Sequence, residues 1–241
     1  MKKYIATLLL TFICVFSQAV AETNENDLGP QVRSGFYFST GLTFGYSYYR
    51  DHYVSGYNEK WEYFENYVYD AFVLYGEARL GRSFSNVFSV YGILGLGLGP
   101  ASLEYSEEGP YSRDKKAEYS ASCLRLALGA GAEFYPVQNQ ESWAYGLFLG
   151  VAVGFAYETV HYDTQHEKSF ILSYGSDLDK DGMPSFFARV EAGKDWWIGK
   201  GRTLGVAVNW TIGGFELEGD NKDYKYDVLT HLIGLTIRYT R

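Results

Sequence analysis

Cysteine, proline, histidine and long apolar runs are all scarce in this chain, and the scarcity excludes several classes of protein. Of its two cysteines, Cys14 lies in the N-terminal apolar segment, so Cys123 alone cannot form an internal disulfide. Beyond that segment there is no run of 18 uncharged apolar residues, which excludes membrane-spanning helices. Basic residues are outnumbered, 21 against 29 acidic ones, which argues against a nucleic acid partner.

The first 21 residues have the features of a secretory signal peptide. Two lysines precede an apolar run from Tyr4 to Phe16, and the small-residue triplet Ala19-Val20-Ala21 follows. The run is too short for a membrane anchor. We expect cleavage after Ala21, which changes the net charge from −8 to −10 because two lysines and no acid are lost. Residues 22–33 are then a short periplasmic segment, and 34–241 form the folded domain.

Aromatic residues and glycine are abundant, with 23 tyrosines, 16 phenylalanines and 27 glycines, a mixture that favours strands. From Ser34 to Arg50, large apolar side chains occupy most even positions and small or hydroxylated ones most odd positions. Neighbouring side chains of a strand point to opposite faces, so this stretch predicts a strand with one apolar face. It is roughly three times the usual strand length of about 5 to 6 residues. Such a strand fits an apolar layer about 25 Å tall.

The same alternation recurs along the chain and predicts eight strands. They begin near Phe36, Phe72, Phe88, Leu124, Trp143, Phe186, Leu204 and Ile233. The connections near 83–86, 136–142 and 198–202 are short, and the other four are long and polar. This layout predicts an all-β fold, an eight-stranded antiparallel up-and-down transmembrane β-barrel with short periplasmic turns and long outer loops. An extra hairpin around 170–174, which would make ten strands, stays open.

The pattern resembles the small eight-stranded outer-membrane proteins of Gram-negative bacteria, the OmpA/OmpX-type, porin-like barrels. Its most specific piece is the C-terminal stretch Gly234-Leu235-Thr236-Ile237-Arg238-Tyr239, which is similar to that family's terminal strand signal, although Thr240 and Arg241 follow the aromatic residue. The resemblance implies location in the bacterial outer membrane, contact with its lipid and lipopolysaccharide, and insertion by the barrel-assembly machinery. The alternative is a soluble β-sandwich or a lipocalin-like exported barrel, with shorter strands and inward apolar faces.

If the large faces meet lipid, the small faces line the lumen, and seven charged residues fall on lumen positions. Buried charges persist when they are paired, so we expect an ion-pair network that fills the narrow interior of an eight-stranded barrel. These residues are Glu77, Arg79, Arg125, Glu133, Arg189, Glu191 and Arg238. The main interpretation is a polar structural core that fixes the strand register. A narrow ion channel is the alternative.

Aromatic residues near both ends of the predicted strands indicate where the membrane ends. Tyrosine and tryptophan gather at lipid interfaces because their rings are apolar and their tips are polar. The predicted girdle consists of Phe36, Tyr46, Tyr48, Trp143, Tyr157, Trp196, Trp210 and Tyr239.

The four predicted outer loops are acidic and the first is rich in aromatic residues. We therefore expect a surface-exposed protein whose loops bind a partner that the sequence does not identify. One loop has ligand spacing: Asp177, Asp179 and Asp181 alternate and a glycine follows, as in the first half of an EF-hand loop. The twelfth position is Ala188 instead of glutamate, so the motif predicts weak calcium binding at most. No other cofactor is expected.

Catalysis is the third hypothesis, because some small outer-membrane barrels modify lipid A. That chemistry needs a histidine with a serine or an acid as partner. Of the four histidines, His52, His161 and His166 fall in predicted loops, and His231 faces lipid by parity with Thr230 and Leu232 beside it. We expect no enzymatic activity.

Overall fold

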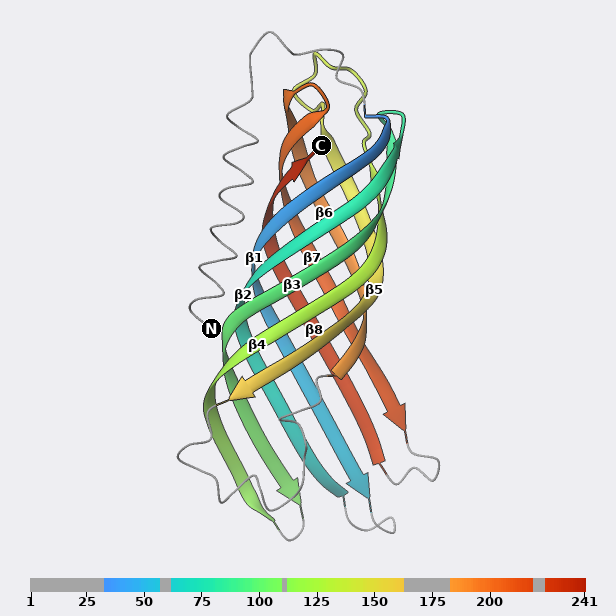
Figure 1. Ribbon diagram of the computed structural model, residues 1–241. Helices are drawn as coiled ribbons and strands as arrows, with labels where there is room; N and C mark the ends of the chain where they lie inside the picture. Colours follow the sequence, from blue (N-terminus) through green and yellow to red (C-terminus); the bar gives the residue numbers. More distant parts are fainter. Residues whose placement is uncertain (1–32, 57–61, 110–111, 163–182, 219–223) are drawn as a thin grey trace.

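The computed structural model describes residues 33–56, 62–109, 112–162, 183–218 and 224–241. Eight antiparallel strands close into one barrel, in which each strand pairs with its sequence neighbours and β1 pairs with β8 (Figure 1). The strands are β1 (Gly35–Gly56), β2 (Glu62–Phe84), β3 (Phe88–Gly109), β4 (Ser112–Phe134), β5 (Leu147–Tyr162), β6 (Met183–Gly199), β7 (Arg202–Glu218) and β8 (Tyr224–Thr240). The predicted all-β, eight-stranded up-and-down fold is therefore confirmed.

In the described part of the chain, no helix is long and apolar enough to span a membrane. The predicted signal peptide and residues 22–32 of the predicted periplasmic segment lie outside the described residues, as does the stretch 170–174.

The barrel has two different ends. The turn end, uppermost in Figure 1, holds the β2–β3, β4–β5 and β6–β7 connections and the C-terminus. At the loop end, β1, β3, β5 and β7 end and β2, β4, β6 and β8 begin. At the turn end, the backbone N–H groups of Phe38 and Arg241 each donate to the other residue's carbonyl at 2.8 Å, so the β1–β8 pairing continues to the last residue.

The strands continue into segments that we expected to be outer loops. β1 to β4 contain 22 or 23 residues each, whereas β5 to β8 contain 16 or 17. Since about 9 to 11 residues of a tilted strand cross a bilayer, the first four strands have a large surplus. It projects at the loop end, lowermost in Figure 1, as a sheet of β1 to β4, with β8 paired to β1 as far as Ser55. We call this projecting part the loop-end sheet.

The β4–β5 connection is longer than the alternation indicated. The predicted fifth strand starts at Trp143, but β5 starts at Leu147. Turn hydrogen bonds hold the intervening residues, with the Tyr145 N–H donating to the Ser142 carbonyl at 2.9 Å. Gly146 ends the turn with φ at +87°, and a Cβ there would lie 2.1 Å from the Asp195 carbonyl oxygen. The apolar alternation of the sequence thus begins at Trp143, before the strand itself begins at Leu147, because the turn ends only at Gly146.

The outer surface of the barrel carries large apolar side chains and the lumen surface carries smaller ones, as the alternation of side chains along each strand predicts. On β5, Phe155 is 67% exposed on the exterior, while its neighbour Ala156 is 3% exposed in the lumen. Closure of the barrel pairs the backbone groups of every strand, which is the condition for crossing hydrocarbon without helices. The apolar exterior therefore faces lipid.

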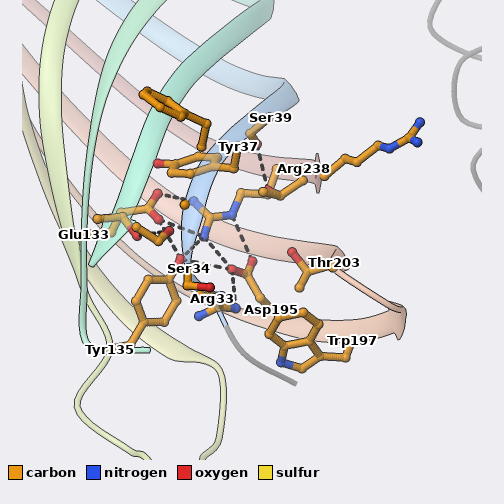
Figure 2. Close-up of a pocket in the computed structure, with 17 residues that line it drawn as sticks. Arg33, Ser34, Tyr37, Ser39, Glu133, Tyr135, Asp195, Trp197, Thr203 and Arg238 are labelled. Carbon is orange, nitrogen blue, oxygen red and sulfur yellow. Dashed lines mark hydrogen bonds and ion pairs between the residues drawn. The ribbon is translucent and has the colours of Figure 1, made fainter. Parts of the chain in front are cut away.

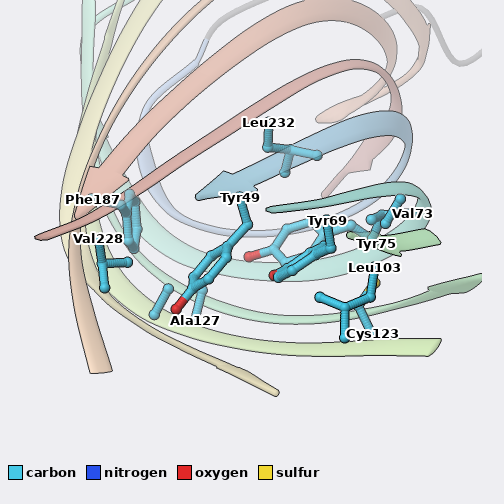
Figure 3. Close-up of a cluster of buried hydrophobic side chains, with 12 residues drawn as sticks. Tyr49, Tyr69, Val73, Tyr75, Leu103, Cys123, Ala127, Phe187, Val228 and Leu232 are labelled. Atoms are coloured by element: carbon cyan, nitrogen blue, oxygen red, sulfur yellow. The ribbon is translucent and has the colours of Figure 1, made fainter. Parts of the chain in front are cut away.

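The loop-end half of the lumen is filled by an apolar and aromatic cluster (Figure 3). At its centre Tyr49 and Tyr69, which are directly paired on β1 and β2, stack with ring centroids 4.6 Å apart. Leu103, Val228 and Leu232 close around them from β3 and β8. We expected small and charged residues throughout the lumen, so this cluster is an addition to the prediction. It packs the loop-end half of the lumen mainly with apolar and aromatic side chains.

Candidate functional site

The turn-end half of the lumen holds a continuous network of charged side chains. It joins four arginines and four carboxylates, all buried or nearly so, and their charges balance. The members are Arg33, Arg79, Arg189, Arg238, Glu77, Glu133, Glu191 and Asp195. Six of them were predicted lumen residues, whereas Arg33 and Asp195 were not.

Arg79 is the hub of this network. From β2 its guanidinium contacts Glu77 at 2.5 Å and, through Nη1, Glu133 of β4 and Glu191 of β6, both at 2.7 Å. A second bond from Nη2 to Glu191, also 2.7 Å, makes that contact bidentate. Charge-assisted bidentate bonds are the strongest side-chain hydrogen bonds in proteins. One arginine therefore ties three strands together across the lumen.

The network continues from Arg79 toward the middle of the barrel. Arg189 on β6 donates to Glu77 at 2.6 Å and to the Thr211 hydroxyl at 3.1 Å. Arg125 does not join it. It donates instead to Glu158 at 3.0 Å and to the Thr230 hydroxyl at 3.2 Å, forming a separate pair.

Toward the turn end the network reaches the barrel mouth (Figure 2). Arg238 on β8 binds Asp195 with two hydrogen bonds of 2.9 and 2.7 Å and also contacts Glu133. Arg33 donates to the same Asp195 at 2.9 Å, and the Tyr135 hydroxyl donates to Glu133 at 2.6 Å. Arg33, two residues before β1, is thus part of the lumen contents. We had assigned Arg33 to the periplasmic segment.

Two of the three missed residues carry a signal in the sequence. Asp195 shares the odd parity of Arg189 and Glu191, but the apolar alternation that predicts the sixth strand ends at Ala192. Glu158 shares the parity of the lumen residues of β5. The sequence places it both on the small face of the fifth predicted strand and at the start of the following loop, whereas β5 runs on to Tyr162. Arg33 has no such signal, because it precedes the strand.

A cavity of about 160 Å³ opens at the turn end, beside Arg33, Asp195 and Arg238. Three buried polar atoms lie in residues that line it: the Tyr37 hydroxyl, Trp197 Nε1 and Thr203 Oγ1. None of them forms a hydrogen bond within the described part of the protein. A cavity of this size and polarity has room for several water molecules. It ends at the ion pairs of the network.

The arrangement can hold the strands in register and can block the lumen. Each carboxylate of the network accepts at least one bond from an arginine, so the charges within the network are compensated. Removing one partner of a buried pair typically costs about 3–5 kcal/mol, because the other charge is left buried. These residues are therefore coupled parts of a plug.

The predicted girdle residues lie on the outside of the barrel. Phe36, Tyr46, Tyr157, Trp196 and Trp210 are exposed on their strands, and Tyr48 and Tyr239 are half-buried. Trp143 is 81% exposed, but it lies in the β4–β5 turn and not in a strand.

The calcium motif of Asp177, Asp179 and Asp181 lies outside the described residues. Among the residues that are described, no three histidine, cysteine or acidic side chains are grouped as metal ligands. His52 is hydrogen-bonded to Asn66 at 2.5 Å, and His231 stacks on Trp210 with ring centroids 6.2 Å apart. Neither contact supplies a nucleophile.

Comparison with known proteins finds no matching family model and no matching curated protein. Among solved structures, the chain is similar to the outer membrane protein OprG from Pseudomonas aeruginosa, at 14% identity and a TM-score of 0.40, covering 86% of this chain and 96% of that one. It is also similar to the outer membrane protease OmpT from Escherichia coli, at 7% identity and a TM-score of 0.40, covering 86% and 97%. A third is Ail, the attachment invasion locus protein of Yersinia pestis, at 14% identity and a TM-score of 0.32, covering 83% and 98%.

The location follows from this chain's own architecture. A closed antiparallel barrel with an even number of strands, an apolar exterior and a polar, filled interior is the design of outer-membrane barrels. The chain is therefore a bacterial outer-membrane β-barrel protein, as predicted.

Proposed function

We propose that the protein is a non-conducting, non-enzymatic barrel that presents its loop-end sheet to a partner outside the cell. The observation that carries this proposal is the filled lumen. The charged network fills the turn-end half, the Arg125–Glu158 pair follows, and the aromatic cluster of Tyr49 and Tyr69 fills the loop-end half. A barrel filled in this way is a rigid support. The binding surface is then the loop-end sheet that the barrel supports.

The chemistry of the loop-end sheet favours a basic partner surface. Glu104 of β3 and Glu118 of β4 stand directly opposite each other, and both are exposed. Like charges directly opposite on neighbouring strands destabilise a sheet, so this pair lowers its energy when a cation approaches. On the other face of the sheet, Tyr67 and Tyr105 pack with ring centroids 4.9 Å apart, which stiffens the support.

Binding of a fluorescent oligolysine peptide to the protein in zwitterionic nanodiscs tests the proposal. We expect salt-sensitive binding that falls several-fold in the double variant Glu104→Lys, Glu118→Lys, because electrostatic attraction to exposed charges is screened by salt. The matched control is Glu141→Lys, which changes an exposed acid at the turn end. Equal binding by wild type and both variants would rule out the loop-end sheet as the binding surface.

A further inference from the structure

An apolar groove runs along the outside of β6 near the turn end. Its floor is Ala192, and its walls are Leu149 of β5 and Val208 of β7, which pair with Ala192 on either side. The two wall residues are 59% and 58% exposed, so the small side chain between them leaves a furrow. The groove is an open hollow of about 570 Å³ with an almost entirely apolar lining.

A lysine stands at the turn-end mouth of this groove. Lys194 is two residues from Ala192 on the same outward face. Its ammonium group lies 5.7 Å from the ring centre of Trp143 and 5.5 Å from that of Trp196, and it donates a hydrogen bond to the Trp143 carbonyl. No carboxylate in the described part of the chain forms an ion pair with it. The two indole rings mark the level of the lipid interface.

The surroundings of Lys194 favour an anion. Among the described residues of the turn end, Arg82, Lys200, Arg202 and Arg241 are exposed or half-exposed, against a single exposed acid, Glu141. A cation on the lipid face near the interface costs about 0–1 kcal/mol in outer-membrane barrels. A phosphate ester beside the ammonium group offsets that cost, because the attraction acts next to a medium of low dielectric constant.

We propose that this groove binds one phospholipid of the periplasmic leaflet. Its phosphate lies against Lys194 between the two tryptophans, and one acyl chain lies over Ala192 between Leu149 and Val208. The occupant comes from the periplasmic leaflet because short turns of such barrels face the periplasm. The site is on the opposite end from the loop-end sheet, so it does not depend on a loop-end partner.

Native mass spectrometry of the detergent-refolded protein with added phosphatidylglycerol tests this inference. We expect the wild type to retain one lipid. Lys194→Gln should lower the retained fraction about fivefold. Each basic residue near an anionic lipid surface strengthens binding by about that factor. The matched control is Arg82→Gln, which removes an exposed turn-end cation that packs on Phe36 and Phe84, on the distant strand β2.

A second pair of variants separates the head group from the chain. Lys194→Arg keeps the charge and should keep the lipid. Ala192→Leu fills the furrow and should lower retention of phosphatidylglycerol and phosphatidylcholine alike. Equal losses in Lys194→Gln and Arg82→Gln would assign the effect to general charge and overturn the site. So would full retention by Ala192→Leu. A gel-mobility shift on boiling shows that each variant has folded.

Discussion

At the residue scale, two arginines of the lumen network each bond to more than one carboxylate. Arg79 bonds to Glu77, Glu133 and Glu191, and Arg238 to Glu133 and Asp195. Aromatic rings cover the same guanidinium groups, with Phe148 3.8 Å from Arg238. Such cation–π contacts are worth more where water is excluded. The pairing alone is weak evidence of stability, but the removal of one partner is costly.

Loss of the hub gives the first test at this scale. We expect Arg79→Ala to lower the free energy of unfolding by about 3–5 kcal/mol, because three buried carboxylates lose a common partner. Urea titration of the protein in lipid vesicles measures this change. The control Arg82→Ala, which removes an exposed arginine of the same strand facing outward, should stay within about 0.5 kcal/mol. Similar losses of unfolding free energy in both variants would contradict a specific contribution of the network to stability.

At the element scale, strand parity accounts for most of what the sequence predicted correctly. Alternation assigned Arg79, Glu133 and Glu191 to the lumen, because a strand has only two faces. Strand ends were harder to predict. Beyond the bilayer no strand face contacts lipid, so neither face has to be apolar. There β1 to β4 continue as strands of polar sequence, which local patterns do not distinguish from loops. At the start of β5, apolar alternation persisted through a turn.

Parity does not predict how large and small lumen residues fit together. Tyr75 on β2 lies across Gly95 and Gly97 on β3, and a Cβ added to Gly95 would lie 1.7 Å from the Tyr75 hydroxyl oxygen. The glycines of β3 therefore make room for a tyrosine of the neighbouring strand. This complementarity involves residues about 20 positions apart, so no local pattern shows it.

Substitution of these glycines tests the fit. Gly95→Ala should destabilise the barrel by about 1–3 kcal/mol, the usual cost of overpacking a core. Gly92→Ala is the matched control on the same strand, since the nearest atom to its added Cβ is 3.9 Å away. Adding Tyr75→Leu to Gly95→Ala should recover part of the loss, because the clashing ring is gone. Thermal unfolding in detergent compares them. No difference between the two glycine variants would contradict the packing.

At the scale of the whole molecule, the barrel combines a filled lumen with two chemically different ends. The loop end carries an acidic sheet, and the turn end carries mainly basic groups around the mouth where Arg33 lies. The overall fold was predictable because it follows from repeated alternation and connection order. The contents of the lumen were predictable only in part, since Arg33 enters from outside the strands and Tyr49 and Tyr69 meet through the register of the β1–β2 pairing.

The most direct test of this organisation is the electrical conductance of single molecules in a planar lipid bilayer. Because paired charges and packed rings fill the lumen along its length, we expect purified, heat-modifiable protein to give no stepwise current above that of the bare bilayer. Regular current steps that change in amplitude when Glu77 or Arg125 is replaced by glutamine would contradict the sealed lumen and establish an ion path through the barrel.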